Sequence, residues 1–254
     1  MENYMNLRKN RIKHKVSNGE IAFIAMGLTH PDDIDSFGPN NFDGIWLEGE
    51  HGWVDASELG NLTRACDIWG MTSVARINSN DQGLIYRTLD RGAQAIVVPH
   101  VNNKKEAQNV VDGGKFAPLG KRGLFTSRQG YGVEDYLLKA NDETSLIVLI
   151  EDIEAWENLD EILSVDGIDT FFVAPSDFAA SMGYINNITH PEVQEKLDDS
   201  INRIVSSGKT AGTLANDENV EKFVDMGVRV ISVGIYDWLG KGSRNFIDKA
   251  NSAL

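Results

Sequence analysis

Short runs rich in apolar and β-branched residues occur eight times along this chain and alternate with helical patterns. Most of these runs are continuously hydrophobic, which is typical of parallel strands that are covered on both faces. Parallel strands need a crossover, usually a helix, between one strand and the next. Eight such units in about 250 residues favour a closed (β/α)8 TIM barrel over an open doubly wound sheet. The predicted strands span residues 21–28, 44–48, 72–77, 95–101, 146–150, 170–173, 210–214 and 230–235.

Helical patterns lie between these runs and near both ends of the chain. No proline- or serine-rich linker divides them, so we expect residues 1–254 to form one α/β barrel domain with extra terminal helices. The G-x-G-x-x-G fingerprint of an open dinucleotide-binding sheet is absent after the first predicted strand. The predicted helices span residues 55–69, 81–91, 104–112, 134–139, 155–163, 191–206, 218–225 and 239–250, and a basic stretch at 8–15 predicts an exposed N-terminal helix face.

The charge balance and the single cysteine narrow the possible functions. With 24 Lys and Arg against 38 Asp and Glu, the formal net charge is −14, which argues against a general nucleic-acid or anionic-membrane binder. Because Cys66 is the only cysteine, one chain can form neither a disulfide nor a cysteine zinc site. No apolar run approaches the roughly 20 residues of a membrane span, and no secretion signal is evident at the N-terminus. We therefore expect a soluble, cytoplasmic protein.

Polar residues are concentrated just after the predicted strands. In a (β/α)8 barrel the carboxyl ends of the strands face the active site, so these positions are the first candidates for chemistry. Strand interiors otherwise hold almost no charge. The residues at these ends are Glu48, Glu50, His51, Arg76, His100, Glu151, Asp152 and Asp177.

Glu151 and Asp177 follow neighbouring predicted strands, those at residues 146–150 and 170–173. Two carboxylates that share a cavity repel each other unless a proton or a cation lies between them. A hard divalent ion such as Mg2+ or Mn2+ suits two carboxylates together with water and substrate oxygens. The alternative that the sequence leaves open is helix capping, with Asp177 as the N-cap of the following segment.

His51 and Arg76 also stand at strand ends. Glu48 and Glu50 lie beside His51 in the sequence, and carboxylate neighbours raise the basicity of an imidazole, which suits a general base near neutral pH. Arg76 is flanked by apolar residues and needs a carboxylate or an anionic ligand as its partner. A purely structural role stays open for both residues.

Other common catalytic arrangements are missing from the sequence, including HExxH, the P-loop and GxSxG. A Schiff-base lysine would have to stand at the carboxyl end of a strand, whereas Lys209 precedes a predicted strand. Metal-assisted enolisation is therefore favoured over a covalent amine mechanism.

The segment Trp46-Leu-Glu-Gly-Glu-His51-Gly resembles the D-G-E-H motif of the HpcH/HpaI family of class II pyruvate aldolases. This family includes 4-hydroxy-2-oxoheptanedioate and 2-dehydro-3-deoxyglucarate aldolases. The resemblance extends from about residue 20 to residue 235 and keeps the order and spacing of the family's motifs. The other matching segments are residues 91–101, 116–123 (FAPLGKRG), 158–169, 174–184 (APSDFAASMGY), 190–194 and 207–209.

The resemblance implies reversible retro-aldol cleavage of a 4-hydroxy-2-oxo acid, of the 2-keto-3-deoxy sugar acid type, to pyruvate and an aldehyde. It implies a divalent cation, Mg2+, Mn2+ or Co2+, that stabilises the enolate of pyruvate together with an arginine. Carried over position by position, it makes Glu151 and Asp177 the metal ligands, His51 the catalytic base, Arg76 the stabilising arginine, Asp90 the aspartate that increases the basicity of the histidine, and Ser176 a backbone contact to the keto acid.

Two positions depart from the family's pattern. Leu149 replaces a substrate-contacting glutamine, and Glu48 replaces the aspartate of D-G-E-H. The segment 123–135 is also shorter than the family's usual loop, and loops at this face shape substrate choice. These departures keep two alternatives open: an acyl-CoA lyase of the malyl- or citramalyl-CoA type on the same barrel, and a catalytically weakened member that binds a keto acid.

The resemblance also implies a homo-oligomer, a hexamer in which C-terminal helices are exchanged between subunits. Residues 239–250 are the candidate segment for this exchange, although the same segment could pack on its own barrel.

Overall fold

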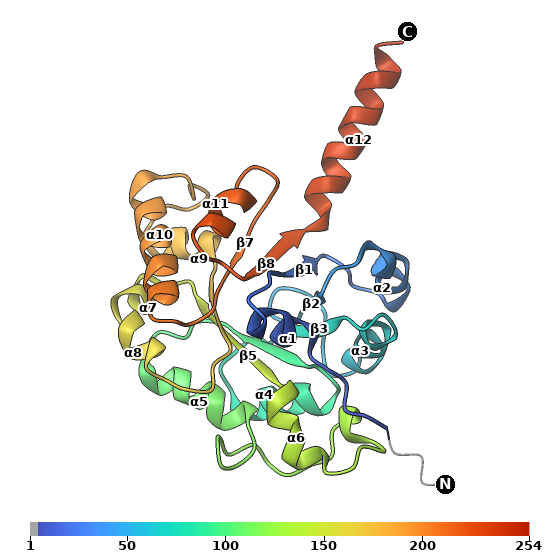
Figure 1. The fold of residues 1–254 in the computed structure, drawn as a ribbon. Coiled ribbons are helices and arrows are strands. Elements are labelled where there is room, and N and C mark those ends of the chain that lie inside the picture. The colour runs from blue at the N-terminus through green and yellow to red at the C-terminus, as the bar shows by residue number, and fades with distance from the viewer. Residues whose placement is uncertain (1–4, 254) are drawn as a thin grey trace.

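Eight parallel strands form a closed barrel in the computed structural model, which describes residues 5–253 (Figure 1). Each strand pairs in parallel with the next one along the chain, and β8 closes the barrel by pairing with β1. The predicted (β/α)8 architecture is therefore confirmed. The strands are β1 (Ala22–Met26), β2 (Gly44–Glu48), β3 (Thr72–Arg76), β4 (Ala95–Val98), β5 (Ser145–Ile150), β6 (Thr170–Val173), β7 (Ala211–Leu214) and β8 (Val230–Gly234).

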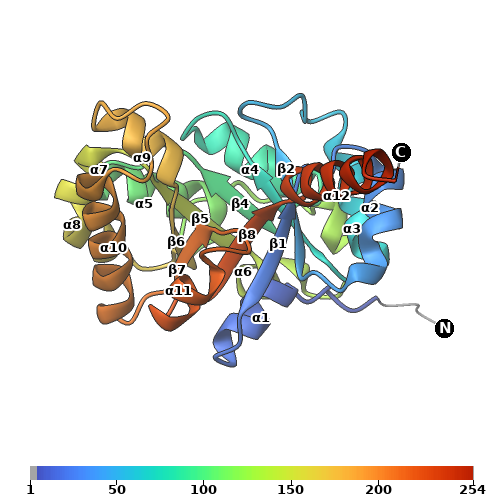
Figure 2. The ribbon, with the colours of Figure 1, turned by 90° about the horizontal axis from the view of Figure 1, so that it is seen from above.

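Helices surround the sheet, with α2 and α3 on one side of the barrel and α7, α8 and α10 on the other (Figure 2). They are α1 (Arg11–Ser17), α2 (Pro31–Phe37), α3 (Leu59–Ile68), α4 (Gln82–Asp90), α5 (Lys104–Gly114), α6 (Tyr136–Glu143), α7 (Ile153–Glu157), α8 (Leu159–Leu163), α9 (Pro175–Ser181), α10 (Pro191–Ser206), α11 (Val220–Asp225) and α12 (Ile235–Asn251). Two 3-10 turns, η1 (Gly38–Asn40) and η2 (Arg128–Gly130), complete the described elements.

The helix predictions need two corrections. The helix predicted at residues 155–163 is two short helices, α7 and α8, because the chain breaks at Asn158 between them. Helices α2 and α9 were not predicted, since seven residues carry too little apolar periodicity to detect. Both begin with proline at the first helical positions, where the missing N–H costs nothing.

Apolar side chains pack on both faces of the sheet, one layer between the sheet and the helices and one layer inside the barrel. Side chains alternate along each strand, so Leu146, Val148 and Ile150 pack toward the helices, while Ile147 and Leu149 point into the barrel. Large apolar side chains dominate the interior cluster, with buried hydroxyls of Thr72, Thr170 and Ser232 on the same side of their strands, so the described part of the barrel interior is a packed core. Its buried members include Ile24, Trp46, Val74, Val97, Ile147, Leu149, Phe172 and Val230.

The N-terminal segment closes the base of the barrel, where the strands begin. Ile12 of α1 is 1% exposed and packs in the interior cluster. Asn10 caps α1 by accepting a hydrogen bond from the Lys13 N–H, and its side-chain amide donates to the carbonyls of Gln94 and Glu143. A short helix and one buried amide thus cover the end of the barrel opposite to the strand carboxyl ends.

The C-terminal helix α12 leaves the barrel and projects away from it (Figure 1). None of its residues is buried, although it carries the large apolar side chains Trp238, Leu239, Phe246 and Ile247. Among residues 5–253, no helix combines the length and the apolar character that a membrane crossing requires.

Candidate active site

The strand register turns three predicted site residues toward the mouth of the barrel. Glu48, Arg76 and Glu151 each follow an inward-pointing residue by two positions, namely Trp46, Val74 and Leu149. Because side chains alternate along a strand, all three charged groups point to the same side as those interior residues. The apolar interior therefore ends in a layer of charge at the carboxyl ends of β2, β3 and β5.

Glu48 and Arg76 form the best-defined ion pair of this layer. The Nε of Arg76 donates to both carboxylate oxygens of Glu48, at 3.0 and 2.8 Å, and Nη2 lies 2.8 Å from Oε2. Oε1 of Glu48 also accepts the backbone N–H groups of Glu50 and His51. Burial alone would raise the pKa of Glu48, but the hydrogen bonds from Arg76 and His51 outweigh it and hold that pKa below its usual value.

Glu50 links residues from three loops. One of its oxygens lies 2.9 Å from Nη1 of Arg76 and 4.0 Å from Nε2 of His51, and the other lies 3.9 Å from Nε2 of His100. The carboxylate is mostly buried, whereas the ring of His51 is 68% exposed. The histidine predicted to be the base is therefore open to the mouth, with a buried acid at its inner edge.

Glu151 is almost fully buried at the end of β5 and accepts the backbone N–H of His100 at 2.8 Å. Burial, aided by the nearby charges of Asp177 and Glu50, raises its pKa to about 7. For His100, burial lowers the pKa, but the hydrogen bond to Asp152 and the charge of Glu151 outweigh burial and raise it. His100 has a φ of 51°, a strained value for a residue with a side chain.

Asp177 stands in the first turn of α9, close enough to Glu151 for its charge to raise the pKa of that carboxyl group. The N-cap of α9 is Ala174, so the alternative that Asp177 is the N-cap is wrong. Within residues 5–253 the Asp177 carboxylate has no recorded hydrogen bond or ion pair, and it is exposed. The backbone N–H of Ser176 lies in the same first turn, where N–H groups have no acceptor within the helix.

The donor set fits a divalent cation only with help from other oxygens. In the part of the chain that the structure describes, no three His, Cys, Asp or Glu side chains are arranged to hold a metal on their own. Glu151 and Asp177 nevertheless supply two hard oxygen donors at neighbouring strand ends, and burial first, then the charge of Asp177, raises the pKa of Glu151. Two carboxylates completed by water and substrate oxygens are the set that Mg2+ or Mn2+ accepts.

Two predicted positions lie away from this layer. Leu149 is 1% exposed and packs inside the barrel with Trp46 and Phe172, below the charged residues. Asp90 ends α4 and pairs at 2.7 Å with Arg122, whose side chain is 1% exposed. Among the described residues no contact joins Asp90 to His51, so one chain alone does not bring these two residues together.

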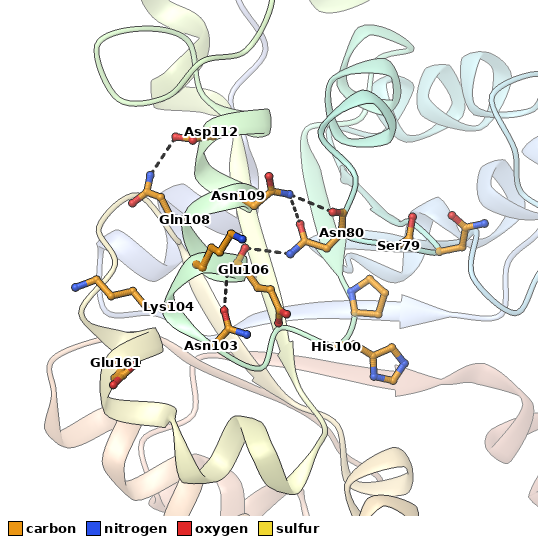
Figure 3. A pocket seen from close by; sticks show the side chains of 13 residues that line it. Ser79, Asn80, His100, Asn103, Lys104, Glu106, Gln108, Asn109, Asp112 and Glu161 are labelled. Atoms are coloured by element: carbon orange, nitrogen blue, oxygen red, sulfur yellow. Dashed lines mark hydrogen bonds between the residues drawn. The ribbon is translucent and has the colours of Figure 1, made fainter.

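Two hollows adjoin the charged layer. One of about 440 Å3 is bordered by Glu48 and Ser176 and opens between the ends of β1, β2 and β6–β8. The other, of about 1160 Å3, extends from His100 along α5 and is lined mainly by amide and charged side chains (Figure 3). Its amides bond to one another, as Asn109 donates to Asn80, which donates to the Glu106 carbonyl. Asn80 and Asn109 are thus held by each other and by the backbone of α5, whereas the lining side chains of Lys104 and Lys105 make no ion pair within residues 5–253.

From the sequence, Glu50 and His100 were placed at strand ends, with Glu50 given a role only as a carboxylate neighbour of His51 and His100 given no role. The signal available was their position alone, since the sequence does not say which neighbouring loops turn toward each other. The structure shows that Glu50 contacts Arg76, His51 and His100, and that His100 donates its backbone N–H to Glu151.

Comparison with known proteins identifies what this chain resembles. The family model for HpcH/HpaI aldolase/citrate lyase matches residues 23–238. A hydroxypyruvate/pyruvate aldolase of Pseudomonas aeruginosa is 34% identical over 91% of this chain and 88% of its own length. A 2-keto-3-deoxy-L-rhamnonate aldolase of Klebsiella pneumoniae is 37% identical over 77% of this chain and 75% of its own. A 4-hydroxy-2-oxo-heptane-1,7-dioate aldolase of Escherichia coli is 34% identical over 83% of this chain and 82% of its own length.

A solved structure shares the fold. The HpcH/HpaI aldolase/citrate lyase family protein from Burkholderia cenocepacia superposes with a TM-score of 0.89, at 24% identity, over 96% of this chain and all of that one.

Proposed function

The chain belongs to the HpcH/HpaI aldolase/citrate lyase family, and we propose from this premise that it is a carbon–carbon lyase acting on 4-hydroxy-2-oxo acids. It cleaves such an acid, of the kind that includes 2-keto-3-deoxy sugar acids, reversibly to pyruvate and an aldehyde. The observation that carries the proposal is the layer of Glu48, Arg76, Glu151 and Asp177 at the mouth, with His51 exposed beside it.

In this proposal Arg76 binds the keto acid and faces the charge that develops during cleavage. A guanidinium has five N–H donors. Glu48 contacts Nε and Nη2 of Arg76, and Glu50 contacts Nη1. Because Nη1 and Nη2 each carry two hydrogens, one N–H on each nitrogen stays available to a ligand. Because both carboxylates fix the plane of the guanidinium, its remaining donors are preorganised for an oxyanion. The backbone N–H of Ser176 is the second donor available to a substrate carboxylate.

His51 handles the proton in this scheme. In cleavage its imidazole removes the proton of the C4 hydroxyl, the C3–C4 bond breaks, and the electron pair passes to the pyruvate fragment. The same imidazole returns the proton to C3, and in synthesis it takes a proton from the methyl group of pyruvate. Its exposure on the loop after β2 leaves the ring accessible to substrate.

Glu151 and Asp177 would hold a divalent cation, Mg2+, Mn2+ or Co2+. Bound there, the cation would supply electrostatic stabilisation of the negative charge on the keto oxygen. The His100 N–H fixes one oxygen of Glu151, so the carboxylate presents a set orientation to the mouth.

The test uses pyruvate alone, without an aldehyde. Exchange of the pyruvate methyl protons with deuterium, followed by NMR, is expected with Mg2+, Mn2+ or Co2+ and is expected to stop with EDTA. Calorimetric titration with Mn2+ should show weaker binding for Glu151→Gln and Asp177→Asn, whereas Glu195→Gln on the outer face of α10 should bind normally. Exchange that continues in EDTA, or unchanged Mn2+ affinity in both variants, would contradict the proposal.

An acyl-CoA lyase is the less favoured alternative. A CoA thioester brings phosphates to the mouth, and among residues 5–253 no lysine, arginine or histidine lines the smaller hollow beside Ser176, whereas Lys104 and Lys105 line the larger one. The exchange experiment also tests the alternative of a catalytically weakened protein that binds a keto acid, because a protein that only binds pyruvate would not exchange its methyl protons.

The assembly that we propose is a homo-oligomer, a hexamer in which α12 packs on another subunit. Helix α12 buries none of its own residues and exposes four large apolar side chains, which an isolated chain would leave in water. A carboxylate from Asp90 would have to reach His51 from another copy of the chain. The cytoplasmic location and the single domain over residues 1–254 stay predictions.

A further inference from the structure

The smaller hollow at the mouth of the barrel has largely apolar walls with a few polar side chains. It is bordered by Glu48 and Ser176, so it begins at the residues that the proposed function assigns to the keto acid. The side chains that form its walls are mainly aromatic and aliphatic. They include Met26, Trp46, Trp53, Val54, Ile188 and Leu214.

Some polar groups of this hollow are engaged within the chain. The Tyr236 hydroxyl donates to the Gly27 carbonyl at 3.0 Å. The side-chain oxygen of Asn216 accepts the backbone N–H of Asn219, whose side-chain oxygen accepts that of Asn216. Glu48 is saturated by Arg76, Trp46 and two backbone N–H groups. The hydroxyl of Ser176 and the side-chain NH2 groups of Asn216 and Asn219 make no hydrogen bond within residues 5–253, so an uncharged ligand finds polar partners here but no cation.

The unpaired charge at this hollow is negative. Glu48 and Asp237 are its acidic side chains, Glu48 is paired with Arg76, and among residues 5–253 no lysine, arginine or histidine lines the hollow. A ligand carboxylate placed here would lose hydration without a cation in the lining and would face repulsion from Asp237. An uncharged apolar chain would bury its surface against Trp46, Trp53 and Ile188 without that cost.

We propose that this hollow binds the C4 substituent of the substrate, the part released as the aldehyde, and that it selects an uncharged substituent over one that carries a carboxylate. This inference rests on the proposed aldolase function and adds the class of aldehyde to it. The volume of about 440 Å3 lies within the range of small-molecule sites and accommodates an aliphatic or aromatic aldehyde beside the keto acid.

The selectivity is tested in the direction of synthesis with pyruvate and two four-carbon aldehydes. Butanal and succinic semialdehyde differ in a terminal methyl group against a terminal carboxylate. Butanal is expected to give the higher kcat/KM, by about tenfold or more, because the carboxylate is unpaired in the hollow. Equal values, or a preference for succinic semialdehyde, would overturn the inference.

A charge placed in the wall should change this preference. Ile188 lines the hollow and is 40% exposed, so Ile188→Arg is compatible with folding. This variant is expected to shift the ratio of kcat/KM values toward succinic semialdehyde by about fivefold, as a partly exposed ion pair would. Ile185→Arg is the matched control, since Ile185 lies in the same segment, is 74% exposed and does not line the hollow.

The outcomes separate this inference from the proposed function. Deuterium exchange into pyruvate tests the proposed function without any aldehyde. If the wild-type protein exchanges the methyl protons but does not prefer butanal, only the inference about the hollow is overturned. Absence of exchange overturns the proposed function itself. If Ile188→Arg changes the assembly state, measured by light scattering, and leaves the aldehyde ratio unchanged, the hollow is a subunit contact and the inference fails.

Discussion

The carboxylate of Glu48 holds the guanidinium of Arg76 through Nε, at 2.8 Å for the shorter contact, and through Nη2 at 2.8 Å. The same carboxylate accepts the backbone N–H of His51, so one side chain fixes both the arginine and the start of the loop that carries the histidine.

Glu48→Gln is expected to lower kcat by roughly 10- to 100-fold, the usual effect of losing a residue that orients an active group. The amide keeps the shape but loses the charge, and its NH2 faces donors from Arg76 and Trp46. Steady-state kinetics would show the loss mainly in kcat. Glu195→Gln, on the outer face of α10, should retain wild-type kinetics, and equal behaviour of the two variants would contradict the assignment.

Without a divalent cation, the stability of the fold is expected to decrease as the pH rises. The pKa of Glu151 is raised from 4.5 to about 7, so the folded protein holds this proton more tightly than the unfolded chain. The stability that this proton adds is complete below about pH 4.5 and is lost as the pH rises through about 7. In EDTA, Tm measured from pH 5 to 8 should therefore decrease more for wild type than for Glu151→Gln. Mn2+ should remove the difference, and parallel curves in EDTA would refute the prediction.

Leu149→Gln is expected to destabilise the fold by about 1–3 kcal/mol, because an amide would enter an apolar interior without partners. Leu149 packs beside Trp46 and Phe172 and is 1% exposed. Urea denaturation would measure the loss. Leu149→Met conserves volume and polarity, so it should cost less than about 1.5 kcal/mol. If the glutamine variant is as stable as the methionine variant, polar groups of the mouth reach this position.

Asp90→Ala is expected to lower the free energy of unfolding by about 2–4 kcal/mol, because it leaves the buried Arg122 cation without its partner. This decrease is smaller than the one expected for a fully buried ion pair, since the Asp90 side chain is 18% exposed. Chemical denaturation of the variant and the wild type measures the difference in the free energy of unfolding. The pH profile of kcat in Asp90→Asn tests the separate prediction that Asp90 increases the basicity of His51, and an unshifted profile would restrict Asp90 to the Arg122 pair.

Phe246→Asp is expected to reduce the assembly size, because it places a charge on the exposed apolar face of α12. Light scattering coupled to size exclusion would show a smaller particle than wild type. Asn245→Asp adds the same acid at the neighbouring position and should leave the assembly intact. A wild-type particle size for both variants would show that α12 does not hold subunits together.

The barrel was predictable because its strands are continuous apolar runs, and each of the eight predicted strands overlaps an observed one. Polar residues at strand ends likewise gave the positions of Arg76, Glu151 and Asp177 along the chain. Both signals are local, since each depends on residues within a few positions of one another.

Contacts between loops could not be predicted in the same way. The ion pair of Glu50 with Arg76 joins residues from different strands, and neither residue's neighbours specify the partner. For Asp90 the sequence did suggest a partner, because the resemblance gave it the role of increasing the basicity of His51. Within the folded chain its carboxylate instead pairs with Arg122. Helix α12 was predictable as a helix, but its projection away from the barrel depends on surfaces outside the local pattern.

Ile12 and Asn10 cover one end of the barrel, and large apolar side chains fill the space between its two ends. Substrate can therefore approach the charged layer only from the opposite end, past Glu48 and Glu151. A protein made without its first eighteen residues would keep every strand and every charged residue of the mouth, but the apolar side chains that Ile12 covers would meet water. The first turns of the chain therefore protect the packed interior on which the charged residues of the mouth rest.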